Sequence, residues 1–383
     1  MANNEHRPFV DLPAGLVEEV LEQTSGIGDV LLASFRELKA GRQARREELI
    51  NRAILRNESS LGYPPLPTTC AADGSYAVER LLSADLAAAA AVAVEGLIPP
   101  SEKRFWEEPR HSTYIVSEMH CADTATVLRA VMLGRELLLA AKAPHDLVML
   151  DMTFTLPIIY FNQAINQAPA SPELKCSTEF LNHCCDYLEA YRDLLKAERS
   201  DKNYIALPKY STRRELGGAM GWPGHQDDRS FLSHLLEPGE FTKPVELEKP
   251  NQPWHFNIGS LPPNICQQAK ALTDQIVSLL STVHVLHYKP HPWLPALRVE
   301  LGIQTARNDH RLASVVQGLK HQCATAGMLE PYPIYLADRT VKALARAIPT
   351  FRQVATQRIC EQYEGEIGDV FFAMHGYRSE SGG

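Results

Sequence analysis

The segment RELLLAAKAPHDLVMLD, residues 135–151, decides the fold that we expect. Apolar residues recur at helical spacing through residues 124–143, which predicts a helix, and HDLVMLD then forms a short, nearly continuous apolar run. Such a run is typical of a strand that is buried on both faces. A helix that leads directly into a buried strand indicates a sheet with helices packed on it, and therefore an α/β protein.

The flanking segments extend this sheet in both directions. Three strands are expected before the helix, at 69–76, 88–96 and 112–119. After the buried strand we expect a helix at 173–198, strands at 204–209, 281–288 and 296–303, and helices to the end. This order predicts a mixed sheet flanked by helices.

The chain ends are expected to lie outside this domain. Residues 1–64 are interpreted as an N-terminal helical extension, with helix over 14–57, a break near 25–29 and a proline-rich linker, GYPPLP, at 62–67. Residues 65–350 are the expected main domain, and 351–383 a C-terminal helix and tail. The N-terminal helix carries seven basic residues: Arg36, Lys39, Arg42, Arg45, Arg46, Arg52 and Arg56. They could form a face that binds a partner or nucleic acid. The interpretation we favour is an ordinary solvated helix surface.

Composition excludes some classes of function. The 383 residues carry a net charge of −8, which argues against a protein that coats nucleic acid by charge alone. The most apolar window, residues 86–94, is too short to span a membrane. The eight cysteines show no CxxC spacing, and the N-terminal residues lack the pattern of a signal peptide, so we expect reduced thiols in a cytoplasmic protein.

Four acidic residues are candidates for metal binding. Asp73, in TTCAADGSYAVER (68–80), is expected to end the first strand, and Asp151 to end the buried strand beside it. Glu136 lies on the intervening helix, and Asp338 is expected to open the last helix. Converging carboxylates are costly without a compensating charge and bind hard cations such as Mg²⁺ or Mn²⁺.

Each acid also has a simpler interpretation. Asp73 could begin a hairpin turn, because Asp-Gly is a common turn pair. Asp151 could cap a helix, Glu136 could face solvent, and Asp338 could favour the positive end of a helix dipole. Their order along the chain is nevertheless that of the ribonuclease H-like two-metal nucleases, in which the acids hold two cations about 4 Å apart.

Three other patterns are rejected as functional sites. His284 and His287 would lie on opposite faces of a strand, and prolines beside His291 prevent a helix that includes it. HCC at 183–185 has adjacent positions that do not share a helix face. GGAMGWPG at 217–224 lacks the ending of a phosphate-binding loop, so any ATPase must be a separate chain.

Over roughly residues 65–345 the sequence resembles the NurA nuclease family. The resemblance rests on five segments in the family's order: AADGSY (71–76), RELLLAAKAPHDLVMLD (135–151), ALPKYS (206–211), DRSFLSHLLEPGEFTKP (228–244), and LPALRVELG (294–302) followed by EPYPIYLADRTVKAL (330–344). It implies a ribonuclease H-like fold.

The resemblance also assigns roles to residues. It implies that Asp73, Glu136 and Asp151 bind metal, that Lys209 contacts a phosphate, and that Ser75 contacts the substrate. Asp338 stands where the family has a histidine, and an aspartate suits Mg²⁺ or Mn²⁺ equally well. The family's Asp-Gly-Ser at the third ligand is Asp-Met-Thr at 151–153.

The implied function is that of a homodimeric deoxyribonuclease with two Mn²⁺ or Mg²⁺ ions, working with a HerA-type hexameric ATPase in DNA-end processing or anti-phage defence. Two alternatives stay open. One is a catalytically inactive adaptor of the ATPase complex, which the changes at 152–153 and 338 motivate. The other is a nuclease of the same superfamily that acts on RNA.

Overall fold

The computed structural model describes residues 12–224 and 226–382, and the chain divides into two compact units after Ile54. The first unit holds α1 (Ala14–Ala40) and α2 (Arg42–Asn51). The predicted break at 25–29 is wrong, because good helix formers on both sides, at 16–23 and 31–40, carry α1 through Gly26 and Gly28. Helix was also predicted too far, since β1 (Leu55–Asn57) follows α2. Residues 1–11 of the predicted extension lie outside the described residues.

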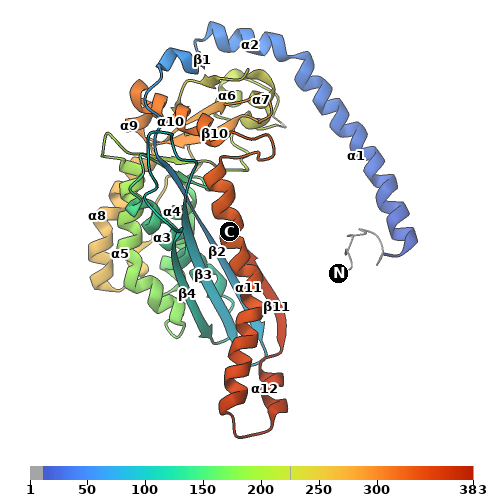
Figure 1. Cartoon of the computed structure of the whole chain (residues 1–383), viewed down its shortest axis with the longest axis vertical. Helices are drawn as coiled ribbons and strands as arrows, with labels where there is room; N and C mark the ends of the chain where they lie inside the picture. Colours follow the sequence, from blue (N-terminus) through green and yellow to red (C-terminus); the bar gives the residue numbers. More distant parts are fainter. Residues whose placement is uncertain (1–11, 225, 383) are drawn as a thin grey trace. The chain divides into compact units, whose positions relative to one another are not determined.

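The described part of the second unit contains one mixed sheet of eleven strands (Figure 1). Its main path runs β1-β7-β9-β10-β6-β5-β2-β3-β4, with β8 pairing β9 and β11 pairing β2. The pairs β2–β5 and β5–β6 are parallel and the others antiparallel. The remaining strands are β2 (Thr69–Leu81), β3 (Asp85–Glu95), β4 (Arg110–Glu118), β5 (Leu147–Leu150), β6 (Asn203–Ala206), β7 (Glu240–Thr242), β8 (Val245–Glu246), β9 (His284–Lys289), β10 (Leu297–Leu301) and β11 (Gly376–Gly382).

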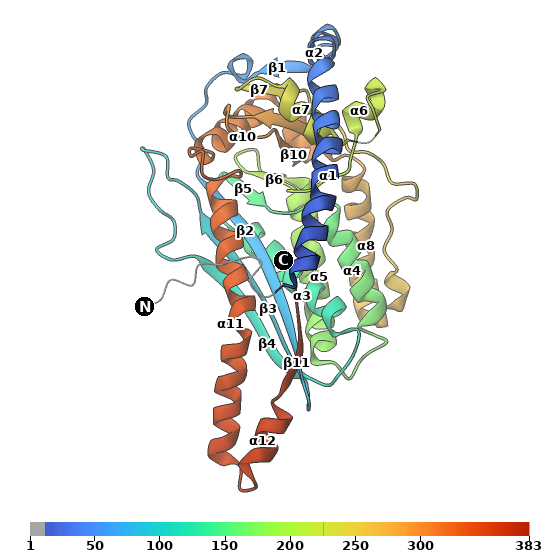
Figure 2. The same cartoon turned by 90° about the vertical axis from the view of Figure 1, so that its right-hand side faces the viewer.

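Helices cover both faces of this sheet (Figure 2). One face carries α3 (Thr124–Lys142), α4 (Leu156–Gln167), α5 (Lys175–Lys196) and α8 (Pro263–Leu280), and the other carries α10 (Asp309–Gln322) and α11 (Tyr332–Gln362). The shorter helices are α6 (Glu215–Met220), α7 (Asp228–Leu235), α9 (Ile303–Ala306) and α12 (Ile367–Ala373). The predicted α/β class, a mixed sheet flanked by helices, is confirmed. None of the described helices combines the length and apolarity needed to cross a bilayer.

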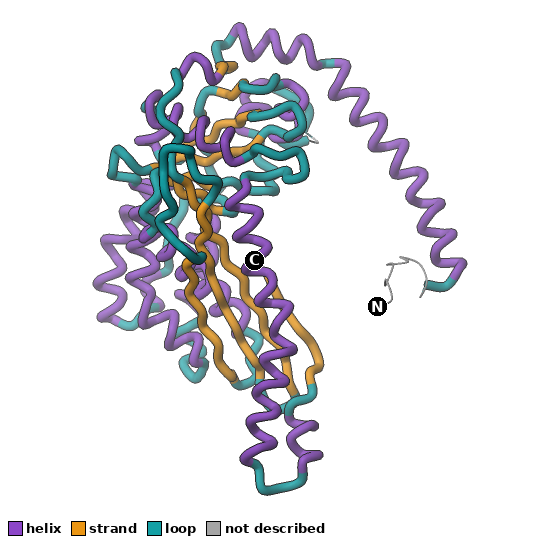
Figure 3. Tube along the Cα trace, in the orientation of Figure 1, coloured by secondary structure: helices purple, strands orange, loops and turns teal. Residues whose placement is uncertain are grey.

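The long strands β2 and β3 separate the two helical layers (Figure 3). Alanines at 87–91 and at Ala93 of β3 are buried, and such small side chains let helices approach closely on either face. Along β2 the side chains alternate, so that Cys70, Ala72 and Tyr76 pack in the core beneath α3. Asp73 therefore projects toward the opposite face, where α11 lies.

Asp73 lies inside β2 and does not end it, so the sequence-based prediction of its position is wrong. Asp73 and Gly74 pair with Val92 and Ala91 in an uninterrupted antiparallel ladder, which also excludes the turn interpretation. On its other edge, β2 pairs with β5 as far as Ala72 and with β11 from Tyr76 onward. Residues 73–75 thus have no strand partner on that edge within the described chain, and a gap is left between β5 and β11.

The C-terminal segment differs from the expected tail. α11 continues unbroken through residues 350–351, where the predicted boundary falls, and β11 then returns along β2. Nothing in the composition of residues 376–382 indicated a strand, because its register depends on the edge that β2 offers.

A buried ion network fixes the loop that follows β5. The Arg298 guanidinium donates two hydrogen bonds of 2.7 Å to Glu215, and it lies 3.3 Å from Glu300. Glu300 accepts hydrogen bonds from the Thr153 hydroxyl and the Phe154 amide, each at 2.8 Å. The arginine thus stabilises a carboxylate that holds residues 153–154 in place.

We predict that Arg298→Leu lowers the free energy of unfolding by about 3–5 kcal/mol in urea denaturation, because it leaves two buried carboxylates uncompensated. Replacing Glu215 by leucine as well should recover part of the loss. The control is Arg56→Leu, which breaks a surface pair with Asp309 and should cost less than about 1 kcal/mol. Equal losses in Arg298→Leu and Arg56→Leu would contradict this account.

Candidate active site

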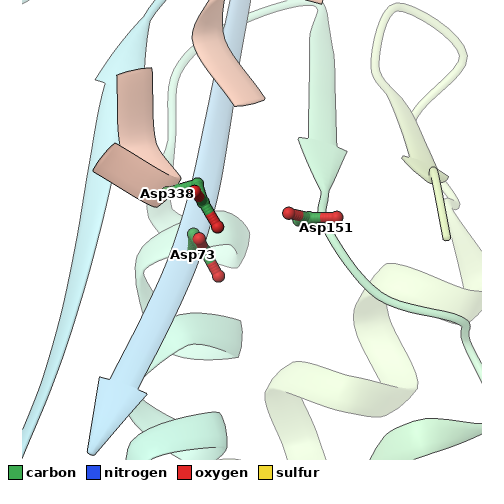
Figure 4. A group of neighbouring side chains, drawn as sticks. All are labelled: Asp73, Asp151 and Asp338. Carbon is green, nitrogen blue, oxygen red and sulfur yellow. The ribbon is translucent and has the colours of Figure 1, made fainter. Parts of the chain in front are cut away.

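Three aspartates from distant parts of the chain meet at the gap beside β2. Asp73 comes from the middle of β2, Asp151 from the residue after β5, and Asp338 from α11 (Figure 4). One carboxylate oxygen of each lies within 4.8 Å of the others. Asp338 was predicted to begin the last helix, but it lies inside α11, which begins earlier, at Tyr332. Asp151 does not cap α4 either, since Thr155 holds the N-cap position.

The parallel strands explain why Asp151 and Lys209 are neighbours. β5 and β6 are paired in parallel, so the segments that leave their carboxyl ends emerge at the same edge of the sheet. Asp151 leaves β5 directly, and Lys209 follows β6 by three residues. This edge meets the part of β2 that carries Asp73.

The Lys209 ammonium forms ion pairs with three of the neighbouring carboxylates. Its Nζ lies 2.7 Å from Asp151, 3.3 Å from Asp338 and 3.1 Å from Glu330, and Lys342 Nζ lies 2.7 Å from Asp338. Glu330 and Lys342 were not singled out from the sequence. The pair Asp338–Lys342 has the i, i+4 spacing that brings side chains together on a helix, and this signal was available in the sequence.

Glu136 approaches the cluster from the other side of the sheet. It is 3% exposed on α3, outside the group of three aspartates. A Cβ added to Gly74 would lie 3.1 Å from Glu136 Oε2 and 2.9 Å from Met132 Cγ, so the missing side chain makes room for the glutamate. Glu136 Oε1 is buried and has no hydrogen-bond partner among the described residues.

Burial and mutual repulsion shift the pKa values of these acids. Burial, together with Asp151 and Asp338, raises the pKa of Asp73 to about 8, against the opposing effects of the Gly74 amide and Lys209. Burial and then Asp73 raise the pKa of Glu136 well above its ordinary value. Burial also raises the pKa of Asp151 despite Lys209. Burial alone would raise the pKa of Asp338, but Lys342 and Lys209 lower it.

The donor set fits a divalent cation. It consists of three carboxylates, whose oxygens Mg²⁺ and Mn²⁺ prefer, and the buried Glu136 nearby has an oxygen with no hydrogen-bond partner among the described residues. Oxygens on opposite sides of one Mg²⁺ lie about 4.2 Å apart, so the 4.8 Å spread is slightly wider than one ion needs. The positive charge of Lys209 lowers the pKa of Asp73, but burial, Asp151 and Asp338 together outweigh it.

The remaining positions considered from the sequence are Ser75 and residues 152–153. Ser75 is 2% exposed, and its contact with a substrate stays a prediction. Met152 is buried in the core beneath α3, and Thr153 bonds to Glu300. Met152 and Thr153 therefore anchor the loop that follows β5.

Comparison with solved structures identifies the fold. The NurA nuclease from Sulfolobus solfataricus superposes with a TM-score of 0.60 at 13% identity, over 93% of this chain and 100% of that one. A NurA structure with manganese gives 0.52 at 14% identity, covering 90% and 99%, and a further NurA structure gives 0.53 at 13% identity, covering 91% and 99%. The chain has a NurA-like fold. No family model matches the sequence, and no curated protein does so.

We predict that Asp73→Asn stabilises the metal-free protein. The pKa of Asp73 is raised in the folded state, so the folded protein retains a proton that the unfolded chain releases above about pH 4. The carboxylate therefore destabilises the fold increasingly from pH 4 to pH 8. The neutral amide should raise the free energy of unfolding in EDTA by on the order of 1–3 kcal/mol at pH 8, and by much less at pH 5.

The matched control is Glu198→Gln, the same acid-to-amide change on a side chain that is 77% exposed, and it should have little effect at either pH. A loss of stability in Asp73→Asn, or a gain that does not change with pH, would contradict the electrostatic account.

Proposed function

We propose that this protein is a metal-dependent DNA nuclease that hydrolyses phosphodiester bonds. The observation that carries the proposal is the convergence of Asp73, Asp151 and Asp338 around one lysine, with Glu136 buried behind them. This arrangement occurs in a fold that is shared with NurA nucleases. An inactive adaptor would gain nothing from retaining carboxylates that repel one another.

In the proposed reaction the acids bind metal ions and Lys209 binds a phosphate. Asp73, Asp151 and Asp338 would hold two Mn²⁺ or Mg²⁺ ions, with Glu136 as a further ligand, and such ions supply an activated water and stabilise the leaving oxygen. Burial alone would lower the pKa of Lys209. Asp151 and Glu330 stabilise its positive charge, so the pKa of Lys209 is raised. It can bind a phosphate oxygen as soon as its contacts with the acids loosen.

The biological setting follows from the same resemblance. We propose a homodimer that receives DNA from a HerA-type hexameric ATPase, in DNA-end processing or anti-phage defence. The net charge of −8 suits an enzyme whose DNA is delivered by a partner. Co-elution of the two proteins in size-exclusion chromatography, with mass measured by light scattering, tests both associations.

We predict Mn²⁺- or Mg²⁺-dependent cleavage of 5′- and 3′-labelled DNA, abolished by EDTA. Asp73→Asn should lower kcat/KM by at least about 100-fold, because it removes an anionic ligand from the ions that stabilise the transition state. Glu198→Gln should cleave like the unaltered protein.

Assays with and without the ATPase, and with an RNA strand of the same sequence, separate the alternatives. Cleavage of RNA alone would contradict the choice of DNA. An adaptor would form the ATPase complex, cleave nothing, and show no rise in melting temperature with Mn²⁺.

Lys209→Met should strengthen Mn²⁺ binding and reduce DNA cleavage. It removes the cation that competes for Asp151 and Asp338, so calorimetric titration should show Mn²⁺ bound roughly tenfold more tightly, a change of about 1.4 kcal/mol. It also removes the phosphate contact, so DNA cleavage should fall. The control Lys196→Met alters a lysine that pairs only with Glu198 among the contacts described and should change neither property. Weaker Mn²⁺ binding in Lys209→Met would contradict the competition.

A further inference from the structure

Glu330 is an acidic partner of Lys209 that lies outside the group of three aspartates. Lys209 Nζ lies 2.7 Å from Asp151, 3.3 Å from Asp338 and 3.1 Å from Glu330. An ammonium has three N–H donors, so three acidic partners can satisfy all of them. Asp151 and Asp338 belong to the candidate metal cluster, and Glu330 does not. A cation in that cluster would therefore compete for two of these partners of Lys209 and leave the third.

The pairing with Lys209 matters to Glu330 as well. The Glu330 side chain is 21% exposed, and Lys209 is the cation that pairs with it in the described part of the chain. Burial raises the pKa of Glu330, and Lys209 opposes this rise. A largely buried carboxylate that loses its cation bears the cost of desolvation uncompensated. Lys209 should therefore stay beside Glu330 when it leaves the aspartates.

Both residues of this pair are attached to anchored backbone. The carbonyl of Lys209 accepts a hydrogen bond from the Arg229 guanidinium, which also donates, at 3.1 Å, to the carbonyl of Ala296. Only Pro331 separates Glu330 from the start of α11, and a proline restricts the backbone of the residue before it. The ammonium can thus leave the aspartates by rotation of the flexible lysine side chain alone.

We propose that Glu330 is a positioning residue that retains the Lys209 ammonium beside the site when a divalent cation displaces it from Asp151 and Asp338. The proposal rests on the proposed nuclease function. It explains how one lysine compensates the acids before metal binds and contacts a phosphate afterwards. An ammonium that donates one hydrogen bond to Glu330 has two N–H donors left for phosphate oxygens. Without Glu330 the displaced side chain would sample many rotamers in solvent.

Lysine acetylation by an N-hydroxysuccinimide ester, quantified by mass spectrometry, reports whether the Lys209 ammonium is held. The full-length chain is labelled with and without Mn²⁺. In the unaltered protein Lys209 should stay protected when Mn²⁺ is added. In Glu330→Gln, Mn²⁺ should increase acetylation of Lys209 at least about tenfold, because an ammonium without acidic partners has a pKa lower by a unit or more and forms the reactive amine more readily. Glu330→Asp should restore part of the protection.

The matched control is Glu198→Gln. It removes the acidic partner of Lys196, whose Nζ lies 3.1 Å from Glu198, and neither residue belongs to the metal cluster. Acetylation of Lys196 in this variant should be the same with and without Mn²⁺.

Steady-state kinetics distinguish positioning from a merely structural role. The KM for DNA should rise at least about fivefold in Glu330→Gln with kcat nearly unchanged, since a phosphate contact made in both the ground state and the transition state contributes uniform binding. A lower kcat at an unchanged KM would contradict the retention of Lys209 for binding phosphate.

Two labelling results would overturn the role of Glu330 and leave the nuclease proposal intact. One is that Mn²⁺ makes Lys209 equally reactive in the unaltered protein and in Glu330→Gln, and the other is that Lys209 stays protected in both. If calorimetric titration of the unaltered protein detects no bound Mn²⁺ and no DNA is cleaved, both proposals fail.

Discussion

Repulsion between carboxylates at the edge of β2 is the constraint on which the rest of the site depends. Asp73, Asp151 and Asp338 lie within 4.8 Å of one another, and Glu136 is buried behind Gly74. Lys209 and Lys342 compensate part of this charge, yet the pKa of Asp73 still rises to about 8. Apolar residues in place of these acids would be more stable, so the retention of so costly an arrangement supports the proposed cation site.

The gap between β5 and β11 gives this cluster its geometry. A continuous strand along that edge of β2 would cover residues 73–75, and here β5 stops at Leu150 while β11 begins its pairing at Tyr76. Glycine at position 74 then leaves space for Glu136. The Arg298 network holds the loop after Asp151 through Glu300 and Thr153. Strand pairing, one absent side chain and one buried ion pair together position the acids.

Periodicity and composition were sufficient to predict the α/β class, because β5 is apolar on both faces and α3 shows a clear helical repeat. Element order suggested that the first strand and the buried strand are neighbours, and with it the proximity of Asp73 and Asp151, but the parallel direction of β2 and β5 was not predicted. The position of Asp73 inside its strand was not predicted, since Asp-Gly is a turn signal in isolation and only pairing with β3 overrides it. Glu330 and β11 depend on contacts between distant segments, which no local pattern encodes.

Anomalous diffraction at the manganese edge, from crystals grown with Mn²⁺, tests the central claim most directly. The account predicts strong anomalous peaks among the carboxylates of Asp73, Asp151 and Asp338, with the Lys209 ammonium displaced from Asp151. Absence of manganese from this cluster at saturating Mn²⁺, with Lys209 still bridging Asp151 and Asp338, would contradict the account and favour the adaptor.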